Sequence, residues 1–345
     1  MDISEGVLYL FNKLSRLFLS FGSIFSLTSL ICALGLAVLF LVIKRRRRNR
    51  PVHIKTIARA LFPKRITTSP SHSADIGYFF FGIFVFGLVL GWAVLSYQVL
   101  SNVVLDALVN TFGAPQPTAL PEFFSRSVIT LTLFLAYELG YWIDHYLSHK
   151  VPILWEFHKV HHSANVLTPL TVFRVHPIDG LINVNIIAIV MAIANGSANY
   201  MFGETAYQYA LTDRNVILVV FVHAYVHLQH THLWISFRGV LGCILLSPAH
   251  HQVHHSDNPV HFDKNLGSCL AIWDWLFGTL HIPKKEPEKL HFGIEPAKSN
   301  DHAIIHGLFG PIYRAALLIG LLFRRKPSRD RASQIEVRGA YDHAK

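Results

Sequence analysis

Long uncharged apolar runs alternate with short polar segments along most of the chain. A helix needs about 20 apolar residues to cross the hydrocarbon core of a bilayer. The runs that reach or approach this length are 18–43, 76–105, 127–142, 181–203 and 215–237, the third interrupted only by Glu138. The pattern predicts an all-α fold, a polytopic bundle of transmembrane helices. The last two runs form either two full spans or a shallower re-entrant pair.

Basic residues beside the first run set the expected orientation. Lys44 and the arginines 45–48 follow this run directly, whereas a cleaved signal peptide carries its positive charges in front of a shorter run. We therefore expect an uncleaved anchor, with the N-terminus outside and residues 44–75 in the cytoplasm. Counting the spans onward brings His145 and the chain after His227 to the same cytoplasmic edge.

The C-terminal apolar run, 315–323, is too short to cross a bilayer. Arg314 precedes it and the basic residues 324–326 follow it. We therefore expect a helix that lies in the membrane interface, followed by a polar tail over residues 327–345.

The composition supports a membrane protein. Only 15% of the residues are charged and 52% are hydrophobic, whereas soluble domains carry roughly 25% charged residues. The net charge of +10 fits nucleic acid or a membrane surface. Because the basic residues cluster beside apolar runs, we expect a membrane and no nucleic-acid partner. Cys32, Cys243 and Cys269 form no CxxC pair, which argues against a disulfide framework or a cysteine-ligated cluster.

Histidine is the unusual residue, because the chain has 22 and most of them lie between His145 and His255. They recur with spacings of three and four residues, which place side chains on one face of a helix. The four groups are His145 and His149; His158, His161 and His162; His223 and His227; and His251, His254 and His255. The third group lies inside the fifth apolar run.

Clustered imidazoles favour a metal site. A single histidine on an apolar helix is usually a hydrogen-bonded structural residue, and we expect that role for His230, His232, His250 and His261. Ten imidazoles at one membrane edge are a different case, because each buried ring needs partners for its nitrogens. Two shared metal ions would meet that need, and neutral imidazole suits iron, copper, zinc and nickel. The spacing predicts a dimetal site in a helical cap on the cytoplasmic side.

Carboxylates are scarce among these groups. Soluble diiron bundles use glutamate ligands and Glu-x-x-His pairs, and no such pair lies among the four groups. The predicted ligand set is therefore mostly histidine. Glu138, seven residues before His145, either accepts a ring N–H or pairs with another polar group of the bundle. Asp144 has the same two alternatives, and His176 is either a ligand or a group that supports one.

The order HxxxH, HxxHH, HxxHH resembles the signature of the fatty acid hydroxylase/sterol desaturase superfamily. The likeness covers residues 125–285 and includes, besides the boxes, the segments 141–145, 152–163, 173–177, 247–248, 265–267 and 273–279. Two positions depart from the family pattern. Tyr146 stands where many members have arginine, and Leu228-Gln229 stands where many have Ser-Asn.

The resemblance implies a membrane-bound, O2-dependent, non-haem diiron oxidoreductase of lipid biosynthesis that hydroxylates or desaturates a C–H bond. A sterol, a fatty acyl chain, an ether lipid and a carotenoid all remain open as substrates. The residues carried over as iron ligands are His145, His149, His158, His161, His162, His223, His227, His251, His254 and His255, with His223 added by analogy. No side chain beyond this metal site is expected to act in catalysis.

Two electrons must reach such a site from outside the chain. The sequence contains no haem-binding module, no GxGxxG fingerprint and no four-cysteine cluster. We expect a separate electron-transfer protein of ferredoxin, cytochrome b5 or reductase type, at a bacterial inner membrane or an endoplasmic reticulum membrane. The predicted divisions are an anchor with its basic flank (1–50), a linker with the second span (51–124), the catalytic domain (125–285), and the interfacial helix with its tail (286–345).

Two other classes of protein remain as alternatives. A histidine-rich metal transporter would spread its ligands at mid-membrane along several spans, whereas the boxes here follow spans and gather at one edge. A catalytically silent metal-binding membrane protein would hold the same ligands without oxidising a lipid.

Overall fold

The chain folds almost entirely into helices. The computed structural model describes residues 3–86, 90–116, 120–203, 207–211, 214–294 and 302–323. Within these residues the only strands are β1 (Ala210–Leu211) and β2 (Arg214–Asn215), which pair antiparallel as a short turn. The predicted all-α fold is therefore confirmed.

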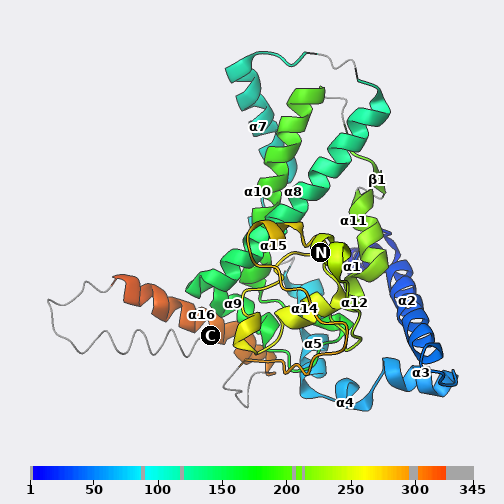
Figure 1. Ribbon diagram of the computed structural model, residues 1–345. Helices are drawn as coiled ribbons and strands as arrows, with labels where there is room; N and C mark the ends of the chain where they lie inside the picture. Colours follow the sequence, from blue (N-terminus) through cyan, green and yellow to red (C-terminus); the bar gives the residue numbers. More distant parts are fainter. Residues whose placement is uncertain are drawn as a thin grey trace.

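Three long helices form a bundle that projects from the rest of the molecule (Figure 1). They are α7 (Tyr97–Phe112), α8 (Glu122–Lys150) and α10 (Pro177–Phe202). α7 and α10 touch through small and polar residues, as membrane helices commonly do. The amide of Asn195 donates a hydrogen bond to the Ser101 hydroxyl at 2.7 Å. Next to it, a methyl group at Gly196 would lie 2.6 Å from the carbonyl oxygen of Ser101.

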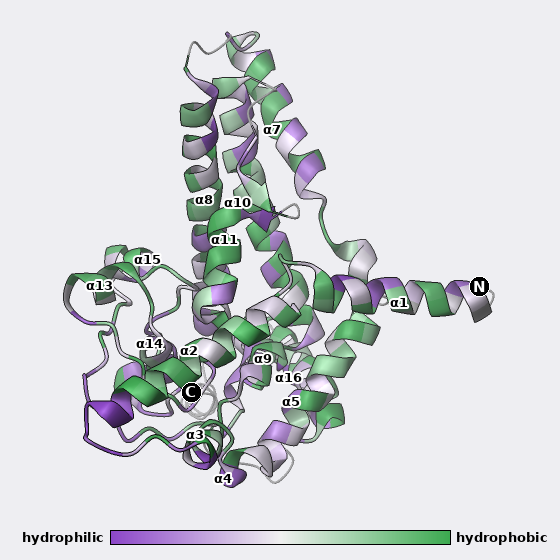
Figure 2. Cartoon of the chain, turned by 90° about the vertical axis from the view of Figure 1, so that its right-hand side faces the viewer, coloured by the Kyte–Doolittle hydropathy of each residue, from purple (hydrophilic) through white to green (hydrophobic). Residues whose placement is uncertain are grey.

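The end of α8 leads into a part that we call the cap, residues 150–173 and 230–294. It contains α9 (Pro152–His162), η3 (Pro169–Phe173), α13 (Gly239–Ile244), α14 (Pro248–His254), η5 (Pro259–His261) and α15 (Ile272–Leu276). Most of the cap is loop between short helices. Hydrophobic residues dominate α2, α8 and α10, whereas hydrophilic residues gather on the loops of the cap (Figure 2).

Four helical segments are long and apolar enough to cross a bilayer. They are α2 (Leu27–Arg46), residues Gly91–Phe112, α10 and α16 (Ile304–Phe323). Large apolar side chains on them face outward; Ile31 and Phe309 are 67% and 66% exposed. Such surfaces are unfavourable in water, so the chain is an integral membrane protein with several spans.

The first two predicted runs do not form single helices. The run 18–43 is not one helix. α1 (Ile3–Leu19) ends at the second residue of the run, and α2 starts only at Leu27. Ser26 caps α2 by accepting a hydrogen bond from Ser29 N. Serine competes for backbone hydrogen bonds and favours such caps, which a count of uncharged residues ignores.

The run 76–105 is divided as well. α5 (Pro70–Phe81) passes into a π-helix, η1 (Gly82–Phe86), and a short 3-10 turn, η2 (Gly91–Ala93), precedes α7. Ser96 caps the start of α7. The second span therefore corresponds to the later part of the predicted run and extends beyond it to Phe112.

The fifth run is too short as a helix for a full span. α11 (Val216–Phe221), the π-helix η4 (Val222–Val226) and α12 (His227–Gln229) end at residue 229, below the length of about 20 residues that crossing requires. Neither alternative holds for the pair as a whole, because the fourth run forms α10, which is long enough to span, whereas the fifth is not. The third predicted run forms the middle of α8, which is 29 residues long.

The prediction of a short C-terminal helix is wrong in its length. α16 has 20 residues, because the helix starts 11 residues before the predicted run and continues through Pro311 and Arg314. The Arg314 guanidinium is neutralised by Glu156 of α9, at 2.5 Å. α16 runs at a steep angle to α8 and α10 (Figure 1). The predicted basic residues 324–326 and the tail lie outside the described residues.

The close approach of α7 and α10 gives a test of this packing. Gly196→Ala should lower the free energy of unfolding by about 1–3 kcal/mol, because the new methyl group meets a backbone carbonyl that cannot rotate away. Gly35→Ala in α2 is the matched control, because nothing lies within 4 Å of its added methyl group. Thermal unfolding of the purified protein in detergent measures both, and equal melting temperatures would contradict this packing.

Candidate metal centre

Two helices joined at a tight corner carry the first two histidine groups. α8 ends at Lys150 and α9 begins at Pro152, so Val151 alone separates them. Proline is favoured in the first turn of a helix, since its missing N–H has no partner there in any case. The corner brings the last turns of α8, with His145 and His149, against α9.

The fourth histidine group lies on α14 and its C-cap residue, His255. A capping box fixes the start of this helix. The Ser247 hydroxyl accepts a hydrogen bond from the backbone of His250, and the His250 ring bonds back to Ser247. Pro248 occupies the first turn. His250 is therefore a helix-capping residue. The helix presents His251, His254 and His255 toward α8 and α9.

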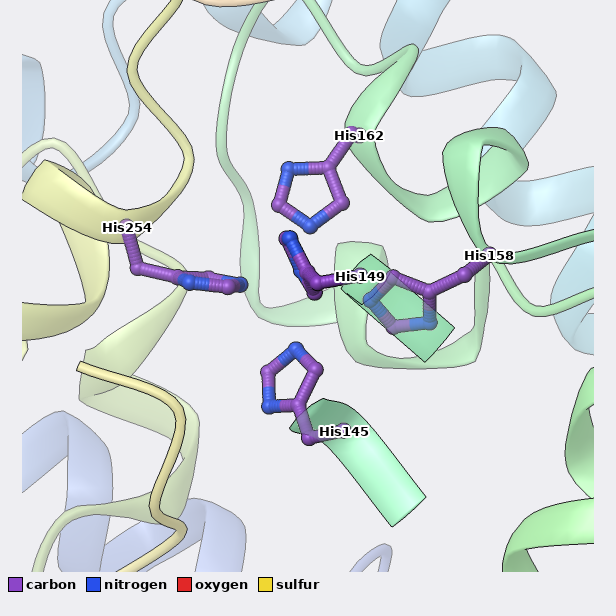
Figure 3. Close-up of side chains that lie close together, drawn as sticks. All are labelled: His145, His149, His158, His162 and His254. Atoms are coloured by element: carbon purple, nitrogen blue, oxygen red, sulfur yellow. The ribbon is translucent and has the colours of Figure 1, made fainter. Parts of the chain in front are cut away.

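Five histidines converge in what we call cluster one. They are His145, His149, His158, His162 and His254, and their candidate ligand atoms all lie within 4.8 Å of one another. Figure 3 shows the five rings pointing toward a common centre from three different helices. The Nε2 atom of every one of these rings is buried and has no hydrogen-bond partner.

The opposite nitrogens of these rings explain why the inner ones have no partner. Nδ1 of His145 lies 2.7 Å from the Leu266 carbonyl oxygen, and Nδ1 of His254 lies 2.9 Å from that of Lys264. A carbonyl oxygen can only accept, so both Nδ1 atoms carry the proton. Their Nε2 atoms therefore direct lone pairs at the centre, as metal-ligating histidines do.

Carboxylates hold two further rings of cluster one. Asp179, in the first turn of α10, lies 3.1 Å from Nδ1 of His158. Asp263 lies 3.4 Å from Nδ1 of His149. An acid on the outer nitrogen orients the ring and makes the inner nitrogen a stronger ligand.

Four more histidines form what we call cluster two: His161, His230, His251 and His255. Nε2 of His230 lies 2.8 Å from Nε2 of His251, 3.2 Å from that of His161 and 3.3 Å from that of His255. One proton can satisfy only one such pair, so four nitrogens that face one another cannot all be satisfied by hydrogen bonds. A cation at their centre would satisfy all four.

The two clusters are direct neighbours. The ring centroids of His162 in cluster one and His255 in cluster two lie 4.6 Å apart. Burial, more than any other cause, lowers the pKa of His254 to about 3, and that of His255 is lowered for the same reason and by neighbouring imidazoles. These rings are therefore neutral at physiological pH, which is the form that binds metals.

The cluster-bearing part of the chain, residues 130–279, matches the model of a family described as "Fatty acid hydroxylase". This region is therefore similar to a fatty acid hydroxylase domain. The resemblance inferred from the histidine spacing is thereby confirmed.

Three relatives match about half of this chain. Alkylglycerol monooxygenase of Danio rerio is 29% identical over 161 residues, 47% of this chain and 32% of the relative. An ornithine lipid hydroxylase of Rhizobium tropici is 31% identical over 48% of this chain and 45% of its own length. A Delta(7)-sterol 5(6)-desaturase of Aspergillus fumigatus is 28% identical, over 48% of this chain and 52% of its own. The chain thus spans about a third of the alkylglycerol monooxygenase. No solved structure matches it.

The fatty acid hydroxylase domain brings eight of the ten predicted ligands into the two clusters and leaves two outside. Nδ1 of His223 bonds to the Val219 carbonyl oxygen and its Nε2 to the Thr28 hydroxyl. Nε2 of His227 bonds to the Ile24 carbonyl oxygen. Neither ring points into a cluster.

His223 and His227 were predicted as ligands from the fifth run, but the ring from this part of the chain that lies in cluster two is His230. The physical reason is the π-helix η4, which contains His223 and ends immediately before His227. A π-helix adds a residue to the turn and so rotates the following residues relative to a regular α-helix. His230 was expected to make only local hydrogen bonds, although it lies three residues after His227 and that spacing could have pointed to it.

The segment 173–177, which contains Arg174 and His176, has a structural role. The His176 ring caps α10 by accepting from Ile178 N, and its Nε2 bonds to the Leu308 carbonyl oxygen of α16. Arg174 is fully buried and donates to the carbonyl oxygen of Val160 in α9. Its charge is balanced by Asp75 of α5 at 3.1 Å. The segment fastens α9 to α5 and α16.

Glu138 and Asp144 pair with polar groups other than the histidine rings. Oε2 of Glu138 accepts hydrogen bonds from the backbone N–H groups of Cys269 and Leu270, at 2.8 and 2.7 Å. Asp144 accepts from the Asn183 amide at 2.7 Å. The second of the two alternatives for these residues is therefore the observed one.

Removing one ring from a cluster tests the assignment. His254→Ala should lower the metal content of the purified protein by about one ion per chain, because it deletes a ligand and opens the centre of cluster one. His223→Ala is the matched control, since both nitrogens of His223 bond to protein groups. Elemental analysis measures both variants. Equal metal loss in the two would refute the division between cluster and non-cluster histidines.

Proposed function

We propose that this chain is a membrane-bound, O2-dependent, non-haem diiron oxidoreductase that hydroxylates or desaturates a C–H bond of a lipid. The observation that carries the proposal is the pair of adjacent, buried clusters whose ring nitrogens face inward. They lie within the domain that relates the chain to a monooxygenase, a hydroxylase and a desaturase.

The residues present fit two iron ions. Cluster one would hold one ion and cluster two the other, with neutral imidazoles as ligands. Zinc also accepts such ligands, but it does not change its oxidation state, whereas oxidation of a C–H bond by O2 requires a redox-active metal. When bound, iron would supply the O2 activation and the electron transfer.

The protein groups around the clusters prepare them for this chemistry. The rings are buried, so water has little access to the centre. The Leu266 and Lys264 carbonyls keep the protons of His145 and His254 on the outer nitrogens. Rings fixed in this way need no rearrangement when a metal binds, which favours a preorganised site.

A lipid substrate is supported by the surroundings of the site. α10 leads directly from the apolar bundle to the cap, and Asp179 in its first turn contacts His158 of cluster one. The clusters are therefore continuous with the apolar bundle, where a lipid substrate would be dissolved. The relatives are named for an alkylglycerol, an ornithine lipid and a sterol, and the shared chemistry among these names is an unactivated C–H bond of a lipid.

The electrons would come from a separate protein at the cytoplasmic face. The basic end of α2, with Lys44 to Arg46, lies at the same end of the molecule as the cap, opposite the tip of the α7–α10 bundle (Figure 1). Basic residues favour the cytoplasmic side, which supports a cytoplasmic cap. A ferredoxin, a cytochrome b5 or a reductase could approach it there.

A comparison of lipid profiles tests the function. Host cells that express the chain should accumulate a hydroxylated or desaturated lipid, and His161→Ala should reduce this product to background because it removes a ligand of cluster two. The His223→Ala variant should keep the product. A product that survives in the His161→Ala cells would contradict the site.

The transporter alternative makes a different prediction. Both clusters lie in and beside the cap, at one end of the bundle, and not along a path through α7, α8 and α10. Metal flux into liposomes without any lipid oxidation would favour a transporter. A bound metal with neither flux nor lipid oxidation would favour a silent metal-binding protein.

A further inference from the structure

One short loop contacts three of the five rings of cluster one. We call it the orienting loop, residues 263–267. The carboxylate of Asp263 lies beside His149, the carbonyl of Lys264 accepts from His254, and the carbonyl of Leu266 accepts from His145. These rings come from α8 and α14, which lie far apart in the sequence. The loop therefore contacts three candidate ligands that lie on two separate helices.

The backbone of the orienting loop has an unusual conformation. Asp263 and Asn265 have φ values of 58° and 57°, in the left-handed region that Asn and Asp tolerate better than most residues. They alternate with Lys264 and Leu266, whose carbonyls face the rings. Gly267 follows, and a methyl group there would lie 2.4 Å from the Leu270 carbonyl oxygen. The conformation of the loop thus depends on Asp263, Asn265 and Gly267, which suit this backbone geometry.

Asp274 stabilises this backbone conformation through hydrogen bonds to the loop. Its carboxylate accepts hydrogen bonds from Leu266 N at 2.8 Å and from Gly267 N at 2.9 Å. The Thr279 hydroxyl, at 2.5 Å, and the Trp142 indole, at 3.3 Å, also donate to it. Asp274 is fully buried, and both of its oxygens are used, so an amide in its place could not accept all of these bonds.

We propose that the orienting loop fixes the rings and proton positions of cluster one, and that Asp263 and Asp274 are positioning residues which set the metal affinity of that cluster alone. This inference rests on the proposed function, because it presumes a metal in each cluster. The three rings that the loop contacts through Asp263, Lys264 and Leu266 all belong to cluster one. The two sites should therefore respond differently when the loop is changed.

Asp263 offers the sharpest test, because its backbone conformation suits glycine. Asp263→Gly removes the carboxylate beside His149 and leaves the left-handed backbone unstrained. It should weaken metal binding at one of the two sites by about 10–100-fold, the usual effect of removing a group that supports a ligand. Asp263→Asn keeps an acceptor oxygen and should weaken it less.

Two controls separate this effect from others. Lys150→Gln removes the ammonium that pairs with Asp263 at 2.6 Å but leaves the carboxylate beside the ring, so it should bind metal like the unchanged protein. Glu138→Gln can keep both of its hydrogen bonds, because both arrive at Oε2 while Oε1 has no partner. Asp274→Asn, by contrast, must lose a bond to the loop and should act like Asp263→Gly.

The measurement is a titration of the full-length protein with Co²⁺, in detergent, after removal of bound metal by a chelator. Visible absorption of bound cobalt reports the ligand geometry, and elemental analysis gives the number of ions. The expected result for Asp263→Gly is one unchanged site and one weakened site with an altered spectrum. A purely structural role of the loop would weaken both sites together.

The outcomes distinguish a failure of the orienting-loop inference from a failure of the proposed function. Unchanged affinity and spectrum in Asp263→Gly, or equal weakening at both sites, would overturn the inference while leaving the proposed function intact. Failure of the unchanged protein to bind any metal would overturn the proposed function itself. Should Asp274→Asn fail to fold, the Asp263 variants still give the answer, since Asp263 is partly exposed and its backbone accepts glycine.

Discussion

Nine buried or half-buried imidazoles whose ring nitrogens face one another in two adjacent clusters are the constraint on which this structure depends. Without a cation, buried lone pairs that face one another have no favourable partner. In cluster one, protein groups on the outer nitrogens of four rings hold those rings in place. The carbonyls of Lys264 and Leu266 do this for two rings, and Asp179 and Asp263 do it for two more.

The helices outside the centre serve the same requirement. α9 carries three of the nine histidines, and it is held at three points. Val151 joins it to α8, Arg174 grips its end at Val160, and Arg314 of α16 pairs with its Glu156. Asp75 compensates the buried charge of Arg174, and losing either partner would leave a buried charge unpaired, which is strongly destabilising. Membrane helices thus act as the frame of a polar centre.

Local spacing predicted the centre better than it predicted the membrane helices. His145 and His149, four residues apart on a regular helix, lie where the spacing places them, and so do the groups on α9 and α14. His230 was missed because it was expected to make only local hydrogen bonds, although it lies three residues after His227. Asp179 was missed because its contact with His158 depends on how α10 packs on α9. The apolar runs predicted several spans, but Ser26, Ser96 and the π-helix η1 divide two of them. Hydrogen-bonding residues inside an uncharged run mark such divisions, and hydropathy alone does not register them.

α8 is one uninterrupted helix of 29 residues, from the far end of the bundle to His145 and His149. Each residue of an α-helix advances the chain by about 1.5 Å and turns it by about 100°. A single insertion or deletion between Glu138 and His149 would swing both rings away from the centre or detach Glu138 from the Cys269 segment. The contacts of Glu138 and of the two rings therefore fix the length of α8 in this stretch to the residue.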